Sequence, residues 1–239
     1  MNRRIAAMCA VLMMLASVGA ATAAAAIEKP VEIKAQYRIY KSGIHIGTVD
    51  ETFVRDRDTY RVVSDTQTAG PLRIFLRDRL TVSAEGRIGE HGLEPARYDF
   101  KRHNDQSRNI QATFDWPHQQ IVSTHNRQTE SFALPTGTLD RLSAMYQFVF
   151  QPPQGEEVQA WMSQGKKAER YRYVKQGEPT LDVDSQRFAT VHFVRDAGPG
   201  ESKAQLWLAK DRHYLPVRML FEDSHGLSLE QRLVSLQTR

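Results

Sequence analysis

Apolar and polar residues alternate along most of the chain from Val31 onward, and this repeat of two constrains the fold more than any other feature. Clear examples are residues 37–40, 97–101, 205–208 and 215–219. Successive side chains of a β-strand point to opposite faces, so such a repeat gives a sheet with one buried face and one face in water. The alternation therefore predicts strands over most of the chain.

Turn-forming residues separate these alternating runs at short intervals. They lie at residues 42–43, 56–58, 90–92, 116–117, 135–137, 198–200 and 224–226. Short loops of this kind join antiparallel strands, and we expect about a dozen strands between them. A sheet with that many strands curls instead of staying flat. We predict a mainly β fold, a curled antiparallel sheet that forms an open or half β-barrel.

Residues 138–150 depart from the repeat of two and follow the period of a helix. Their apolar stripe consists of Leu139, Leu142, Met145, Tyr146 and Val149. Thr138 is placed to cap the first turn, Asp140 suits the positive end of the helix dipole, and Pro152 ends the helix. We predict one helix here, covering the open face of the curled sheet. Residues 71–80 are a weaker helical candidate.

Residues 1–26 have the three parts of a secretory signal peptide: Arg3 and Arg4, an apolar run at 5–18, and small residues at 21–26. The alternative is a membrane anchor, but the run has roughly 14 residues where a span needs about 20. We predict cleavage near residues 23–26 and a periplasmic location.

The only cysteine, Cys9, lies within this leader. The mature chain is therefore expected to have no disulfide, thiolate metal site or cysteine nucleophile. A lipoprotein would carry its cysteine after the apolar run, whereas here the run continues past Cys9. No second long apolar stretch follows, so we expect no transmembrane span in the mature chain. We treat residues 27–239 as a single β-rich domain with a candidate hinge at 151–155.

Charge and motifs argue against several functions. Lys and Arg number 32 against 28 Asp and Glu, a net charge of +4 that is too small and too dispersed for nucleic-acid binding. The eight histidines show no metal-binding spacing, and the chain has no Gly-x-Ser-x-Gly motif or Gly-rich phosphate loop. We predict no metal, no cofactor and no catalytic residue. A hydrolase would need distant side chains to converge, and the candidates are Asp99, Asp115, His118 and Asp211.

A curled sheet of this size encloses more volume than one helix fills, and such a space suits an apolar ligand. The candidate lining consists of aromatic strand residues and part of the helix stripe: Trp116, Trp161, Trp207, Phe193, Leu142, Met145 and Val149. The alternative is that these side chains only fill the core. A basic cluster, Arg73, Arg77 and Arg79, is a candidate contact with anionic lipid head groups; otherwise it faces solvent beside Asp78.

Several ordered landmarks carry a family resemblance. They are residues 37–47, 83–86, 92–95 with Tyr98, 114–115, 139–143 and 207–218. Their order and spacing resemble the secreted proteobacterial family catalogued as domain of unknown function 3108, over roughly residues 33–237. That family has no established activity, so the resemblance implies an envelope location and a β-rich fold but no catalytic residues. The closing segment also resembles, at the level of the fold, the open half-barrel of periplasmic lipoprotein carriers.

Three functions stay open at this point. The first is a non-enzymatic envelope protein that binds a lipid or other apolar ligand inside the curled sheet. The second is a structural protein that scaffolds an envelope complex through a protein partner. The third is a hydrolase acting on envelope polymers. The size and lining of any internal cavity would discriminate between the first and the others.

Overall fold

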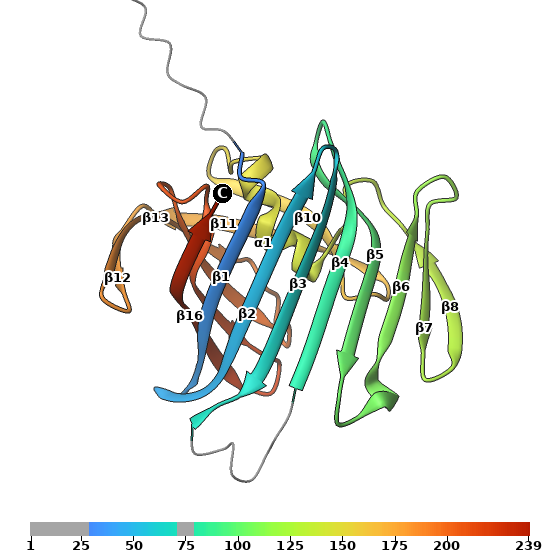
Figure 1. Cartoon of the computed structure of the whole chain (residues 1–239), viewed down its shortest axis with the longest axis horizontal. Coiled ribbons are helices and arrows are strands. Elements are labelled where there is room, and N and C mark those ends of the chain that lie inside the picture. The colour runs from blue at the N-terminus through green and yellow to red at the C-terminus, as the bar shows by residue number, and fades with distance from the viewer. Residues whose placement is uncertain (1–28, 71–78) are drawn as a thin grey trace, which may run out of the picture.

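The computed structural model describes residues 29–70 and 79–239. Within these residues, sixteen strands form one sheet, and a single α-helix accompanies it (Figure 1). The predicted leader at 1–26 lies outside the described residues, as does most of the weaker helical candidate. The part of that candidate which is described, Arg79 and Leu80, belongs to a strand and not to a helix.

The first half of the chain is a meander in which each strand pairs antiparallel with the next. Its strands are β1 (Glu32–Lys41), β2 (Ile44–Asp56), β3 (Thr59–Thr68), β4 (Arg79–Gly89), β5 (Gly92–Arg102), β6 (Ile110–Asp115), β7 (Gln120–His125) and β8 (Gln128–Ala133). A short 3-10 helix, Gln106–Arg108, joins β5 to β6. The tight turns and antiparallel register are those that the sequence pattern predicts.

The second half begins with a two-residue strand and the helix, and continues as a second meander. Its elements are β9 (Leu139–Asp140), α1 (Arg141–Phe150), β10 (Glu157–Ser163), β11 (Ala168–Gly177), β12 (Thr180–Val183), β13 (Gln186–Arg195), β14 (Lys203–Ala209), β15 (Leu215–Glu222) and β16 (Ser228–Thr238). Strand β16 pairs antiparallel with β1, which joins the two meanders into one sheet. Strand β12 pairs only with β13 and stands beside the main path.

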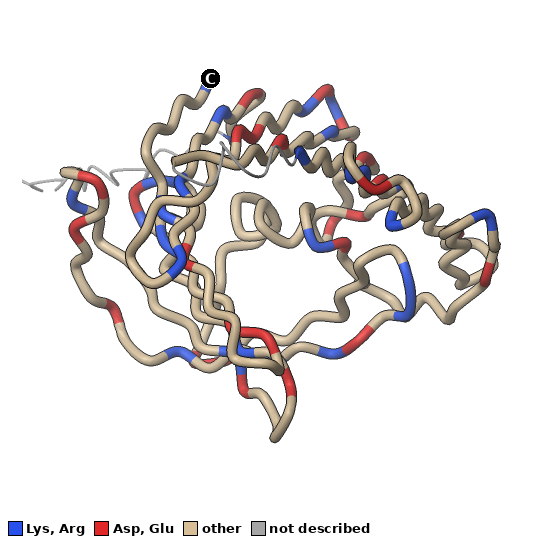
Figure 2. Tube along the Cα trace, turned by 90° about the horizontal axis from the view of Figure 1, so that it is seen from below, with Lys and Arg blue, Asp and Glu red and all other residues tan. Residues whose placement is uncertain are grey.

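The sheet curls around α1, which lies between β1–β5 in front and the C-terminal strands behind (Figure 1). Figure 2 looks along the inside of this curled sheet, with the helix within it. Hydrogen-bonded pairing ends at β8 on one side and β9 on the other, so the described strands do not close into a barrel. Packing contacts, and not backbone hydrogen bonds, bring the β10–β11 turn against strands β5 and β6. Gly165, in the turn between β10 and β11, lies against Ile110 of β6 and Tyr98 of β5. The predicted fold class is therefore confirmed.

The helix begins at Arg141, three residues later than predicted. The cap is Asp140 and not Thr138: its carboxylate accepts hydrogen bonds from the N–H groups of Leu142 at 2.8 Å and Ser143 at 2.9 Å. Thr138 instead donates its hydroxyl to the carbonyl of Pro135. The prediction of the cap was wrong because residues 139–140 pair in parallel with β10 and are held extended, which delays the first helical turn.

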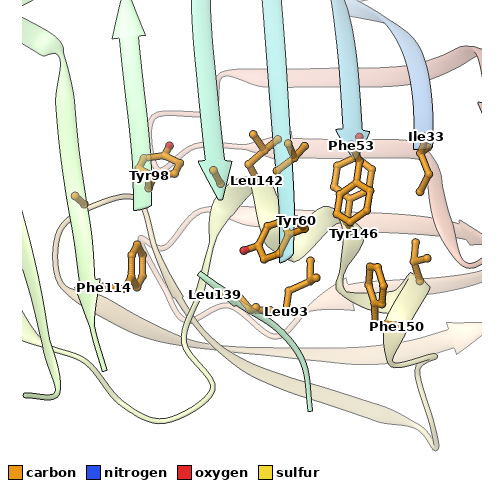
Figure 3. Close-up of a cluster of buried hydrophobic side chains, with 14 of the residues drawn as sticks. Ile33, Phe53, Tyr60, Leu93, Tyr98, Phe114, Leu139, Leu142, Tyr146 and Phe150 are labelled. Carbon is orange, nitrogen blue, oxygen red and sulfur yellow. The ribbon is translucent and has the colours of Figure 1, made fainter. Parts of the chain in front are cut away.

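Figure 3 shows the main core, where the buried side of α1 meets β1–β5. Phe53 is fully buried and stacks on Tyr146 of the helix, with 5.0 Å between the ring centroids, and it also stacks on Tyr60 at 5.8 Å. Leu142 and Val149 enter the same cluster. Burial of this apolar area against one side of the helix holds α1 to the first half of the sheet.

Candidate functional site

A cavity of about 510 Å³ lies between α1 and strands β10, β11, β14 and β15. This volume is within the range of about 300–1,000 Å³ that is typical of small-molecule sites. The wall includes Met145 and Phe148 of α1, Met162 of β10, Tyr171 of β11 and Phe221 of β15. Most of the lining is therefore apolar or aromatic, and the shape and chemistry suit a ligand with a large apolar surface.

The cavity lies on one side of α1 only. Arg141, Ala144, Met145 and Phe148, spaced by three and four residues, face the cavity. The opposite side of the helix is packed into the core described above. The single helix thus has a packed side, toward β1–β5, and a side toward β10, β11, β14 and β15 that borders the cavity.

Two buried polar clusters hold the filled side of the helix in place. Tyr146 donates its hydroxyl to the Glu51 carboxylate at 2.8 Å, and Ser64 donates to the same group at 3.1 Å. Burial raises the pKa of Glu51, while these two hydrogen bonds and the charge of Arg141 act to lower it. Because these groups are buried and bonded to each other, they position the helix.

The second cluster surrounds the cap. The Ser143 hydroxyl bonds to the Asp140 carboxylate and also lies 2.6 Å from the Tyr60 hydroxyl. Burial raises the pKa of Asp140 to about 6, against the hydrogen bonds that lower it. Asp140 and Ser143 are both 0% exposed, so a substrate cannot reach this serine as it stands.

The structure separates the predicted lining residues. Met145 lines the cavity, whereas Leu142 and Val149 lie in the core on the other side of α1. Phe193 is buried in a cluster with the cavity residues Tyr173 and Ala204, without lining the cavity itself. One of the seven predicted residues therefore reaches the hollow space directly.

The tryptophans lie elsewhere. Trp116 packs against the main core and donates its Nε1–H to the carbonyl of Pro95 at 2.7 Å. Trp207 is stacked on His192 with 4.2 Å between the ring centroids, and Arg218 lies over its ring at 4.6 Å. Trp161 is on β10, between two residues that line the cavity, but is not itself part of the lining.

Of the basic cluster considered for lipid head groups, Arg73 and Arg77 lie outside the described residues. Arg79 begins β4 and forms an ion pair with Asp65 at 3.1 Å. Its charge is therefore partly neutralised within the sheet.

The side chains that a hydrolase would bring together have separate partners. Asp115 pairs with His118, and that contact lowers the pKa of Asp115. Asp99 pairs with Arg97, and Asp211 pairs with its neighbour Arg212. Over residues 29–70 and 79–239, no three His, Cys, Asp or Glu side chains come close enough to hold a metal ion.

Sequence reasoning missed several cavity residues, among them Arg141, Phe148, Tyr171, Tyr173 and Phe221. Two signals were present. Tyr171 and Tyr173 are two residues apart on one strand and therefore share a face. Arg141 and Phe148 are seven residues apart in the helix, on a stripe different from the apolar stripe that contains Leu142 and Val149.

Fold and cavity together define a β-barrel-like protein in which an open, curled antiparallel sheet surrounds one helix and leaves space beside it. The family model described as protein of unknown function (DUF3108) matches residues 36–232, and the chain belongs to this family. The resemblance noted in the sequence is thereby confirmed. In the described residues, no helix has the length and apolar content needed to span a membrane.

A solved structure shows similarity at the level of the fold. The β-barrel-like protein of domain of unknown function DUF1849 from Brucella abortus is 12% identical, with a TM-score of 0.57, over 88% of this chain and 99% of that one. A protein with a YmcC-like fold from Bacteroides fragilis is 9% identical, with a TM-score of 0.38, over 87% of this chain and 96% of that one. A search of curated proteins finds no match.

Proposed function

We propose that this protein is an exported, non-enzymatic protein of the cell envelope that binds a lipid or other apolar ligand beside α1. The observation that carries the proposal is the cavity of about 510 Å³ with its largely apolar and aromatic wall. The signal-peptide pattern of residues 1–26 supports the envelope location. An apolar ligand would gain affinity from buried area, at about 25 cal/mol per Å² of surface removed from water.

The packed side of the helix supports the same function. A hollow beside a loosely held helix could be filled by movement of the helix. Here, Tyr146 and Glu51 join α1 to β2, and Ser143 and Tyr60 join it to β3. These buried hydrogen bonds keep the cavity open before a ligand arrives, and a site that is formed in advance saves part of the cost of binding.

The test uses cis-parinaric acid and its methyl ester, two apolar probes that fluoresce when they enter a dry site. The wild-type protein should bind at least one of them with saturation at one site per chain. Ala160→Trp places a large ring on the cavity wall and should weaken binding at least about tenfold, equivalent to about 1.4 kcal/mol. Ala189→Trp is the matched control, because Ala189 lies exposed on β13 and does not line the cavity.

Two results would count against the proposal. One is the absence of saturable binding of either probe to the wild-type protein. The other is equal loss of binding in both tryptophan variants, which would place the site elsewhere. Native mass spectrometry of the protein purified from the envelope adds an independent measurement, since a retained lipid should appear as a defined mass increment.

A further inference from the structure

Most charged side chains around the cavity already have partners within the protein. Arg172 donates to Glu157 at 3.0 Å, and Lys203 donates to Glu222 at 2.8 Å. The Asp223 carboxylate accepts two backbone N–H groups, each at 2.9 Å. These groups have little capacity left for a ligand.

Arg141 differs from them. It is the first residue of α1 and lines the cavity, and within the described residues its guanidinium makes no hydrogen bond and no ion pair. The ring of Phe221, also in the cavity wall, lies 5.7 Å from its Cζ atom. A cation at the start of a helix gains nothing from the helix dipole, which favours anions there. The free protein therefore keeps a cation at the cavity wall without a direct ion pair, although its charge also acts on the buried Glu51 carboxylate.

A second guanidinium stands in the same wall. The side chain of Arg195, on β13, is only 7% exposed and pairs with Glu201 at 2.9 Å. Its Nη1 atom donates to the carbonyl and hydroxyl oxygens of Ser202, but its Nε–H is buried without a partner. An unsatisfied buried donor is costly, so the hydrogen-bonding capacity of Arg195 is not fully used within the protein.

The charges of the two arginines act on the same pair of tyrosines. The guanidinium of Arg195 lies over the ring of Tyr171, with 4.1 Å from Cζ to the centroid. Burial is the largest influence on the pKa of Tyr171 and raises it; it also raises the pKa of Tyr173 to about 12. The positive charges of Arg195 and Arg141 both oppose that rise at each tyrosine. Both cations therefore act on one region of the wall, and the rest of the wall is mainly apolar.

We infer that the cavity takes a single-chain anionic amphiphile, whose carboxylate or phosphate head group is held by Arg141 with Arg195 behind it. This inference rests on the proposed function and names the chemical class of its ligand. The apolar chain lies along Met145 and Phe148 of α1, and the head group supplies the anion that Arg141 lacks. Guanidinium groups bond to carboxylate and phosphate oxygens with paired N–H donors, so either head group fits the same chemistry.

The acid and ester forms of cis-parinaric acid share one chain and differ in charge, so their affinity ratio measures the head-group contribution. At pH 7.5 and low salt, the wild-type protein should bind the acid about tenfold more tightly than the ester. Arg141→Gln should reduce that ratio to about two or less, mainly by weakening binding of the acid. The matched control is Arg187→Gln, because Arg187 is exposed on β13 and pairs with Asp182 away from the cavity.

A charge reversal and added salt sharpen the test. Arg141→Glu should bind the ester more tightly than the acid, and added salt should lower the wild-type preference for the acid. Equal affinity of the wild-type protein for acid and ester would overturn the inference and leave the proposed function standing. An unchanged ratio in Arg141→Gln would also overturn it. Failure of the wild-type protein to bind either form would reject the proposed function as well.

Competition then distinguishes the two head groups. Palmitate, 1-palmitoyl lysophosphatidic acid and neutral monopalmitin are each added against bound parinaric acid, below their aggregation limits. Displacement by palmitate at the lower concentration assigns a carboxylate head group, and the reverse order assigns a phosphate. Displacement by monopalmitin at the same concentration as both anions would contradict a role for the head-group charge.

Discussion

The position of α1 depends strongly on Asp140, and replacing this residue tests how the helix is held. Its carboxylate accepts two backbone N–H groups and the hydroxyl of Ser143 in a fully buried site. Loss of a helix cap costs about 0.5–2 kcal/mol, and a buried hydroxyl left without a partner costs about 1–3 kcal/mol. We therefore expect Asp140→Ala to lower the free energy of unfolding by roughly 2–4 kcal/mol.

Asp140→Asn is the matched variant, because an amide keeps the cap and removes the charge. Burial raises the pKa of Asp140 from 3.8 to about 6, so the folded protein binds this proton more tightly than the unfolded chain does. The contribution of Asp140 to stability therefore grows as the pH falls from about 7 to about 4. Relative to Asp140→Asn, the wild-type protein should gain about 2–3 kcal/mol over this range.

Urea unfolding at pH 7 and pH 4, followed by circular dichroism and tryptophan fluorescence, measures both effects. Subtracting the Asn variant from the wild type at each pH cancels the titration of all other groups that the substitution leaves unchanged. Equal stability of Asp140→Ala and Asp140→Asn at pH 7 would refute the role of the cap. A wild-type minus Asn difference that does not change with pH would refute the effect of burial on this carboxyl.

Two further predictions concern packing, and both are read from urea unfolding curves. Tyr146→Phe removes one of two hydroxyl donors to the buried carboxylate of Glu51. It should lower the free energy of unfolding by about 1–3 kcal/mol. Unchanged stability would mean that water or another group replaces the donor. Gly165→Ala and Gly43→Ala both place a side chain at positive φ, +82° and +78°, which costs about 1–2 kcal/mol. An added Cβ at Gly165 would lie 2.7 Å from Ile110 Cγ2, whereas an added Cβ at Gly43 meets nothing within 4 Å. Gly165→Ala should therefore lower the free energy of unfolding by about 1–3 kcal/mol more than Gly43→Ala does. Equal losses in the two variants would contradict the close approach of the β10–β11 hairpin to β6.

The sequence predicted the architecture because the fold rests on local patterns. Alternation over a few residues is enough to define each strand, and the short turns define the antiparallel order. The helix was also predicted, because its apolar stripe is complete within residues 138–150. Leu142 and Val149 of that stripe were expected to line a ligand site, whereas they lie in the core. The cap was assigned wrongly because the pairing of residues 139–140 with β10 is a contact with a later segment.

The cavity could be anticipated only as a consequence of the curled sheet. Whether a large side chain lines a space or fills it depends on distances between distant strands. Trp116 and Trp207 illustrate this: each is an obvious aromatic candidate in the sequence, yet one packs against the core and the other lies between His192 and Arg218. The absence of an ion pair at Arg141 was equally hidden, because it appears only when all neighbours are placed.

The pairing of β1 with β16 has a consequence for how the chain folds. Residue pairs in this ladder, such as Ile33 with Thr238, are separated by nearly the whole described chain, whereas every other strand pair in the two meanders is local or nearly so. Hairpins can form as soon as their own residues meet, but this ladder must wait for the last strand to arrive. The seam between the two meanders therefore joins two partial sheets into one, and it requires the longest loop closure of any strand pair in the described residues.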